Sequence, residues 1–283
     1  MPTVRASGVE LYYEDTGRGT PIVWSHEFGG DFRSWEPQVR HFARRHRVVT
    51  YNHRGYPPSE VPKAAADYTQ DLLVEDLRRL IEHAGLGPVH LAGCSMGANV
   101  ARDLAIAHPG LVRSLILVGA GAGSVDREQF LQGQAATAAA LEREGIAALV
   151  RNLERLPARA AFRQKDPRGF AEFLRGVAEH DAQACAHLAR GVMAKRRTVQ
   201  ESADGLKALP MPTLIMVGDQ DAPCVEPSLL MRGWIPHAGL VVFPACGHTP
   251  NLEEPALFNA HVAEFLAAVE AGRGAGWVAL ERP

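Results

Sequence analysis

Short apolar runs alternate with longer amphipathic stretches along most of this chain. Each run is rich in valine, isoleucine and leucine, which predicts a buried strand, and the stretches between the runs repeat apolar residues at helical spacing. The predicted strands cover residues 4–6, 9–14, 21–25, 47–51, 88–92, 112–118, 213–218 and 239–244. The predicted helices cover residues 33–44, 69–84, 97–108, 226–233 and 255–270. This alternation predicts an α/β protein with a mostly parallel sheet.

The alternation stops between about Gly121 and Leu209. No strand-like run occurs there, and apolar residues recur at helical spacing in two stretches, 146–153 and 170–177. We therefore predict a helical insertion over residues 121–208. The α/β core is then formed by residues 1–120 together with residues 209–283.

The most informative motif lies where the predicted strand 88–92 meets the next helix. Gly93-Cys94-Ser95-Met96-Gly97 has the pattern G-x-S-x-G between a strand and a helix. A serine in so sharp a turn has a strained backbone, and side chains at the two glycine positions would clash. The turn would lift the Ser95 hydroxyl above the sheet edge and direct the Met96 N–H toward an oxyanion. Ser95 is therefore a candidate nucleophile and Met96 a candidate oxyanion donor.

A nucleophilic serine needs a base and a group that orients this base. The predicted strand 213–218 is followed by Asp219 and Asp221, and the strand 239–244 is followed by Gly247-His248. Both segments lie past the carboxyl ends of strands, where open parallel sheets place their ligands. The order Ser95, then an aspartate, then His248 is the order of the α/β-hydrolase fold.

With these motifs in this order, nearly the whole chain resembles the α/β-hydrolase superfamily, in its branch of serine esterases, enol-lactonases and cofactor-free perhydrolases. Four further blocks carry the resemblance: 21–30 (strand and oxyanion loop), 48–59 (normally ending Asp-x-Arg-Gly-x-Gly-x-Ser), 107–118 (the joint after the elbow helix) and 247–259 (the histidine segment). The resemblance implies an eight-stranded sheet with helices on both faces. It also implies that the helical insertion is a cap above Ser95.

The resemblance also implies which residues form the site. The family's acid is the second carboxylate of Gly-Asp-x-Asp, so the implied catalytic triad is Ser95, Asp221 and His248, and Asp219 becomes a loop or capping residue. The implied oxyanion hole consists of the backbone N–H groups of Phe28 and Met96.

Two positions depart from the family pattern. Glu27 replaces the usual glycine after His26, and Asn52 replaces the usual aspartate. Because the oxyanion donors are backbone groups, a side chain at position 27 need not destroy the hole. We expect Glu27 to have a structural role in the loop.

Composition narrows the function classes. A formal net charge of −2 argues against a nucleic-acid binder, and no apolar run approaches the ~18 residues of a membrane span. The N-terminus lacks the apolar core of a signal peptide, and four irregularly spaced cysteines suggest no disulfide framework, so we expect a cytoplasmic protein.

His180, Cys185 and His187 do not have zinc-ligand spacing, so we expect no metal. The expected partner is a small-molecule substrate; the oligomeric state stays open.

The implied activity is cofactor-free hydrolysis of a small or medium carboxylic ester or lactone through an acyl-enzyme. The serine at the elbow argues against the dehalogenase and epoxide-hydrolase branches, which carry an aspartate there. Two other functions stay open. The same triad could cleave a carbon–carbon bond of a vinylogous diketone, and a hydrolase scaffold with slow turnover could serve as a ligand receptor.

Overall fold

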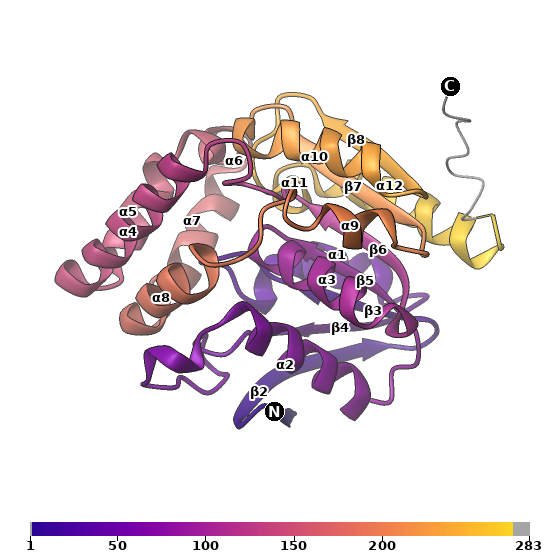
Figure 1. Cartoon of the computed structure of the whole chain (residues 1–283), viewed down its shortest axis with the longest axis horizontal. Helices are drawn as coiled ribbons and strands as arrows, with labels where there is room; N and C mark the ends of the chain where they lie inside the picture. Colours follow the sequence, from indigo (N-terminus) through magenta and orange to yellow (C-terminus); the bar gives the residue numbers. More distant parts are fainter. Residues whose placement is uncertain (1, 274–283) are drawn as a thin grey trace.

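Eight strands form one sheet in the order β1-β2-β4-β3-β5-β6-β7-β8 (Figure 1). The computed structural model describes residues 2–273, so residues 274–283 of the predicted core lie outside the described residues. The strand bounds are β1 Thr3–Ala6, β2 Val9–Gly17, β3 Pro21–Ser25, β4 Arg47–Tyr51, β5 Val89–Cys94, β6 Val112–Val118, β7 Thr213–Gly218 and β8 Ala238–Phe243. The β1–β2 and β2–β4 pairs are antiparallel, and all the pairs from β4–β3 to β7–β8 are parallel. The predicted mostly parallel sheet is confirmed.

Strand β2 extends three residues beyond its predicted end at Glu14. The added residues are polar, so the apolar pattern gave no signal for them. They continue the sheet because they pair with β4, with Asp15 opposite Val49 and Gly17 opposite Arg47. An ion pair of 2.6 Å between Arg47 Nη2 and Asp15 Oδ2 adds to this pairing.

Helices cover both faces of the sheet. Their bounds are α1 Glu36–Phe42, α2 Gln70–His83, α3 Met96–Ala107, α10 Ala222–Trp234, α11 Pro250–Glu253 and α12 Pro255–Glu270. Residues of β6 alternate between the two faces, as a strand requires. Leu115 and Leu117 join the apolar cluster that contains α2 and α3, whereas Ile116 and Val118 join the cluster that contains α1 and α12. These two clusters hold the helices at fixed positions against the sheet.

Helix α10 begins at Ala222, four residues before its predicted start. Asp221 is the residue before its first turn, and Pro223 lies within that turn, where its missing N–H costs nothing. Pro227 lies inside the helix, and the sequence pattern placed the start near this residue. The earlier start puts Asp221 at the junction of β7 and α10.

The segment between β6 and β7 contains only helices and turns among its described residues. They are α4 Arg127–Glu144, α5 Ala147–Arg155, the 3-10 turn η4 Pro157–Arg159, α6 Ala160–Lys165, α7 Pro167–Val177, α8 Ala182–Leu188, the π-turn η5 Ala189–Met193 and α9 Ala203–Lys207. Helices α4 to α8 gather beside one end of the sheet in Figure 1. A Cβ atom at Gly29, which follows β3, would lie 3.2 Å from Leu153 of α5. The inserted helices therefore pack against the loops at the carboxyl ends of the strands.

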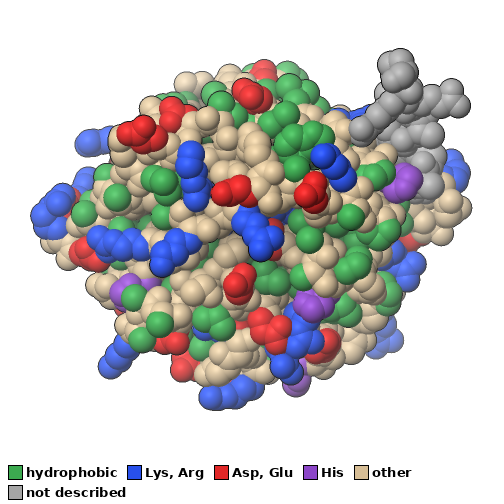
Figure 2. Space-filling view, viewed as in Figure 1, with side chains coloured by type: hydrophobic (Ala, Val, Ile, Leu, Met, Phe, Trp, Pro, Cys, Tyr) green, Lys and Arg blue, Asp and Glu red, His purple; other side chains and the backbone are tan. Residues whose placement is uncertain are grey.

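Charged side chains of both signs are interspersed on the face of the molecule shown in Figure 2. This distribution agrees with the small net charge of −2. One surface ion pair, between Lys165 of α6 and Glu254 before α12, joins the inserted helices to the core. Within residues 2–273, no helix is long and apolar enough to cross a membrane.

Candidate active site

Ser95 lies in a strained turn between β5 and α3. Its φ of 52° and ψ of −109° are unusual for a residue other than glycine. The two neighbouring glycines make this turn possible, because a Cβ atom at Gly93 would lie 2.3 Å from the carbonyl oxygen of Gly97. A Cβ atom at Gly97 would lie 2.2 Å from the carbonyl oxygen of Ser25. The elbow is thus packed backbone against backbone, and it brings Ser95 beside the loop that follows β3.

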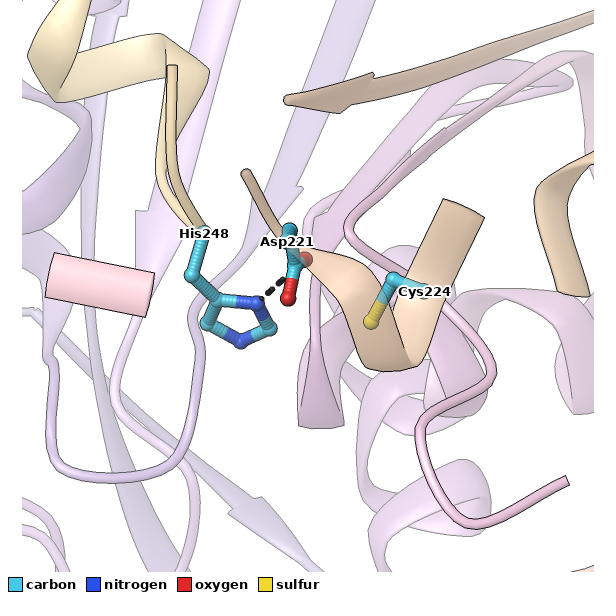
Figure 3. A group of neighbouring side chains, drawn as sticks. All are labelled: Asp221, Cys224 and His248. Carbon is cyan, nitrogen blue, oxygen red and sulfur yellow. Dashed lines mark hydrogen bonds and ion pairs between the residues drawn. The ribbon is translucent and has the colours of Figure 1, made fainter. Parts of the chain in front are cut away.

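His248 and Asp221 form a hydrogen-bonded pair at the ends of β8 and β7 (Figure 3). The distance between His248 Nδ1 and Asp221 Oδ2 is 2.7 Å. Asp221 is buried, and the His248 side chain is 14% exposed. Because an ionised carboxylate only accepts hydrogen bonds, Nδ1 carries the proton and Nε2 has a free lone pair. This arrangement suits a general base.

The alternative acid, Asp219, has a different environment. Its side chain is exposed, and Oδ1 accepts a hydrogen bond of 3.1 Å from the backbone N–H of Cys246. Asp219 therefore supports the turn before His248 without contacting the imidazole. The structure brings Asp221, and not Asp219, to His248.

Ser95 and His248 lie at the same edge of the sheet without a direct hydrogen bond between their side chains in the described part of the chain. A Cβ atom at Gly119, just after β6, would lie 3.3 Å from both Asp221 Oδ2 and His248 Cε1. The Ser95 backbone N–H donates to the carbonyl of Val118, the last residue of β6, at 2.8 Å. Catalytic hydrogen bonds are often long in structures without substrate. The absent bond therefore does not disqualify the pair.

The loop after β3 carries Phe28, the second implied oxyanion donor. The carbonyl of Glu27 accepts hydrogen bonds from Gly30 N–H, at 3.1 Å, and from His26 Nδ1, at 2.9 Å. Since the carbonyl and the N–H of one peptide point in opposite directions, these bonds fix the direction of the Phe28 N–H. Phe28 is half-buried and Met96 is fully buried.

His26 is a structural member of this loop. Its Nδ1 donates to the Glu27 carbonyl, and its Nε2 accepts a hydrogen bond of 3.1 Å from the backbone N–H of His53. The bond that Nε2 accepts requires the neutral imidazole, because both nitrogens of a protonated ring are donors. Burial lowers the pKa of His26 from 6.5 to about 4, so the ring is neutral at physiological pH.

Glu27 points its side chain inward, beneath its own loop. It is fully buried, and Ser34 Oγ donates to its Oε1 at 3.2 Å. Oε1 also lies 4.0 Å from Nη2 of Arg159, a buried residue of the inserted turn η4. Burial raises the pKa of Glu27. The sequence identified position 27 as unusual but contained no signal for its partner Arg159, which lies more than a hundred residues away.

The hydrogen bonds of Asn52 account for the asparagine where the family usually has an aspartate. Its Oδ1 accepts a hydrogen bond of 2.7 Å from Phe32 N–H, and its Nδ2 donates one of 2.7 Å to the carbonyl of Pro57. An aspartate would supply the first bond and not the second, because a carboxylate has no donor. The amide therefore ties the loop after β3 to the loop after β4.

The candidate metal ligands of the sequence do not form a site. His180, Cys185 and His187 are not gathered by the described structure, where the only group of three potential ligand atoms is Asp221, Cys224 and His248, within 4.8 Å of one another (Figure 3). Cys224 Sγ donates to the Gly119 carbonyl at 3.3 Å, and burial raises the pKa of this thiol well above 9.0. Asp221 and His248 of this group bond to each other, and the Cys224 thiol bonds to the backbone.

A cavity of about 740 Å³ lies beside the candidate site, between the loop after β3 and the inserted helix α7. Gly29 and Gly30 form one wall, and Phe162 and Phe173 form part of the other. Ser95, Asp221 and His248 do not line it. The cavity thus adjoins the outer side of the oxyanion loop and does not open onto the candidate nucleophile.

Comparison with known proteins defines the class. A model of the alpha/beta hydrolase fold matches residues 20–255, so the chain belongs to the α/β-hydrolase family. It is 30% identical over 277 residues to a protein of Azorhizobium caulinodans whose provisional name is carbamate hydrolase RutD, which covers 95% of this chain and 100% of that relative. It is 29% identical over 282 residues to 2-hydroxymuconate semialdehyde hydrolase of a Pseudomonas species, with 94% of this chain and 93% of the relative covered.

The fold has close counterparts among solved structures. A thermophilic esterase from Thermogutta terrifontis superimposes with a TM-score of 0.85 and 29% identity, covering 95% of this chain and 99% of the esterase. Sequence and structure together therefore define a hydrolase of the α/β family, and its relatives act on several kinds of bond.

We expect Gly97→Ala to damage both stability and activity. The new methyl group would overlap the carbonyl of Ser25, and relieving such overpacking typically costs about 1–3 kcal/mol. Chemical denaturation and ester turnover measure the two effects. The matched control is Gly133→Ala in α4, where nothing lies within 4 Å of the new Cβ. Equal stability and activity in both variants would contradict the close contact at the elbow.

Acid should weaken the fold through His26. The folded protein takes up this proton at a pKa of about 4, whereas the unfolded chain takes it up near 6.5, so the contribution is complete above pH 6.5 and falls as the pH drops toward 4. The loss from this residue is about 3 kcal/mol. Urea unfolding at pH 7 and pH 4.5 measures it. His26→Gln should show a smaller difference between the two pH values, and an equal difference would show that His26 titrates normally.

Proposed function

We propose that the protein is a serine hydrolase that cleaves a small or medium carboxylic ester or lactone through an acyl-enzyme. The hydrogen bond of 2.7 Å between His248 and Asp221 carries this proposal, because it orients an imidazole at the sheet edge where Ser95 follows β5. The likeness to the Thermogutta terrifontis esterase supports the ester as substrate class.

In the proposed first step, His248 Nε2 accepts the hydroxyl proton as Ser95 Oγ attacks the substrate carbonyl carbon. The backbone N–H groups of Met96 and Phe28 stabilise the tetrahedral oxyanion, and such a donor typically contributes about 3 kcal/mol. His248 then gives its proton to the departing alkoxide, which leaves as an alcohol. Water attacks the acyl-enzyme with His248 again as base, and the carboxylic acid and free Ser95 are released.

The inserted helices would form the roof of this site. Leu149 and Leu153 of α5 lie within 4 Å of the Cβ position of Gly29, next to Phe28, and Ser95 is only 6% exposed. An apolar roof over the loop that carries Phe28 would exclude water and limit the size of the substrate. This supports a small or medium ester as substrate.

Two neighbouring reactions are the main alternatives. The same residues could hydrolyse a carbon–carbon bond, as the name of the Pseudomonas relative describes for that protein, or a carbamate, as the provisional name of the Azorhizobium relative does. A panel of aryl esters of increasing acyl length, a carbamate and a dienone substrate separates these reactions by kcat/KM. A burst of product followed by negligible turnover on every substrate would favour the receptor function instead.

The cytoplasm is the compartment that we propose. All four cysteines are free and buried, which agrees with a reducing environment. Growth of the source cells followed by fractionation and immunoblotting tests this assignment.

Ser95→Ala should lower ester turnover by roughly 10⁶-fold, because the members of a triad act as a unit. The fold should persist, since the change removes a single oxygen atom. A serine-reactive aryl phosphonate should label wild-type protein at Ser95, and mass spectrometry of the peptides identifies the labelled residue. Near-normal turnover by the alanine variant would overturn the proposed nucleophile.

Asp221→Asn should cost far more activity than Asp219→Asn. Only Asp221 contacts His248, and the loss of such a carboxylate lowers kcat by about 10⁴-fold because the imidazole takes the wrong tautomer. Asp219→Asn is the matched control, since its amide oxygen still accepts from Cys246 N–H. Steady-state kinetics on one ester compares the two variants, and the reverse ranking would assign the acid to Asp219.

A further inference from the structure

Three segments that are distant in sequence meet at the guanidinium group of Arg159. This residue lies in the inserted turn η4 and is 1% exposed. Its Nη1 donates to Thr249 Oγ1, next to His248, at 2.9 Å, and its Nη2 lies 4.0 Å from Glu27 Oε1, next to Phe28. The group also stacks over the ring of Phe173 in α7, at 4.7 Å from the ring centroid. A single side chain, that of Arg159, thus connects the segment that carries His248 with the loop that carries Phe28.

Thr249, which Arg159 contacts next to His248, is also bound by Glu253 in α11. Thr249 Oγ1 donates to Glu253 Oε1 at 3.1 Å, and the same carboxylate accepts from the N–H groups of Gly247, at 2.6 Å, and Thr249, at 2.8 Å. The backbone N–H of His248 donates to the carbonyl of Ala158, the residue before Arg159, at 2.9 Å. The backbone of residues 247–249 is therefore fixed on one side by Glu253 and on the other by the inserted turn.

The oxyanion side depends on the position of Glu27. The peptide bond after Glu27 carries the Phe28 N–H, so a shift of this residue turns the proposed donor. The carboxyl group is wedged under the loop, where a Cβ atom at Gly30 would lie 2.5 Å from its Cδ. Ser34 Oγ donates a hydrogen bond of 3.2 Å to this carboxyl group. The position of Glu27 therefore depends on Ser34 and Arg159.

Burial disfavours the ionised form of Glu27, and the charge of Arg159 is the strongest of the neighbouring effects that favour it. Each has one further buried atom, Glu27 Oε2 and Arg159 Nε, that forms no hydrogen bond in the described part of the chain. A buried charge that loses its partner is strongly unfavourable, and the surrounding structure shifts to hydrate it. Loss of either residue should therefore displace the loop that holds the other.

We propose that Glu27 and Arg159 are positioning residues whose buried ion pair sets the distance between the oxyanion donor Phe28 and the base His248. The proposal rests on the serine-hydrolase function proposed above, and it assigns to the inserted turn η4 a part in assembling the site. Neither side chain is one of the proposed reacting groups, and both are buried.

The test compares four variants with wild-type protein: Glu27→Gln, Arg159→Met, Arg159→Lys and the double variant Glu27→Gln/Arg159→Met. We measure kcat and KM on one ester, the rate of Ser95 labelling by an aryl phosphonate and the midpoint of thermal unfolding. Each single neutralising variant should lower kcat and the labelling rate by about 10–100-fold, because displacements of about 1 Å near reacting groups have effects of this size. KM should change little, since substrate contacts are kept.

The double variant separates positioning from stability. It removes both charges, so its unfolding midpoint should return toward that of wild type, whereas its kcat should stay low because the distance between the loops is no longer fixed. Arg159→Lys keeps the charge but loses the fork that reaches both Thr249 and Glu27, so its kcat should be intermediate.

The matched control is the surface ion pair between Lys165 and Glu254, which also joins the inserted helices to the core. Lys165→Met and Glu254→Gln should leave kcat and the labelling rate unchanged. If wild-type protein is labelled at Ser95 and the double variant has wild-type kcat, the positioning role is overturned and the serine-hydrolase function stands. If wild-type protein is neither labelled nor active, both proposals are overturned.

Discussion

No side chain fits between the end of β3 and the first turn of α3, and the candidate site depends on this constraint. The backbone carbonyl of Ser25 occupies the position that a Cβ atom at Gly97 would need. The loop that carries Phe28 therefore lies directly against the turn that carries Ser95. Since both strands belong to one hydrogen-bonded sheet, the pairing of Ser25 with Gly93 fixes the register of these two loops. The proposed nucleophile and the proposed oxyanion donors are thereby positioned by the backbone.

The proposed base is held by different means. His248 follows the last strand of the sheet, and its position depends on side chains: Asp221 at the imidazole and Glu253 at the flanking N–H groups. The carbonyl of Ala158 adds a bond from the inserted helices. The site therefore combines a part that any glycine-rich elbow would supply with a part that depends on particular polar residues of this chain.

The elements of the core could be predicted from the sequence because they depend on local patterns. The apolar runs of β5 and β6 identify buried strands, and the glycines around Ser95 identify the elbow. The helix α10 begins four residues before its predicted start, and Pro227 lies inside it. The polar end of β2 was missed because it is a strand through its pairing with β4 and not through its composition.

Contacts between distant segments could not be predicted. Asn52 was recognised only as a departure from a family pattern, and its two hydrogen bonds, to Phe32 and to Pro57, explain why an amide is required. Arg159 was one of many arginines in a helical stretch, most of which are exposed. Only the three-dimensional structure distinguishes it, because burial beside Glu27 depends on how the insertion folds back over the core.

The hydrogen bond between His248 N–H and the carbonyl of Ala158 has a consequence for how such a protein can change its substrate during evolution. Because this contact is made by backbone atoms, it constrains the path of the chain at residue 158 and places no demand on the side chain there. Helices α4 and α5 on one side of the turn and α6 to α8 on the other can therefore diverge in sequence. The backbone of the turn keeps its position beside His248, so new pockets can form on either side of it over an unchanged candidate site.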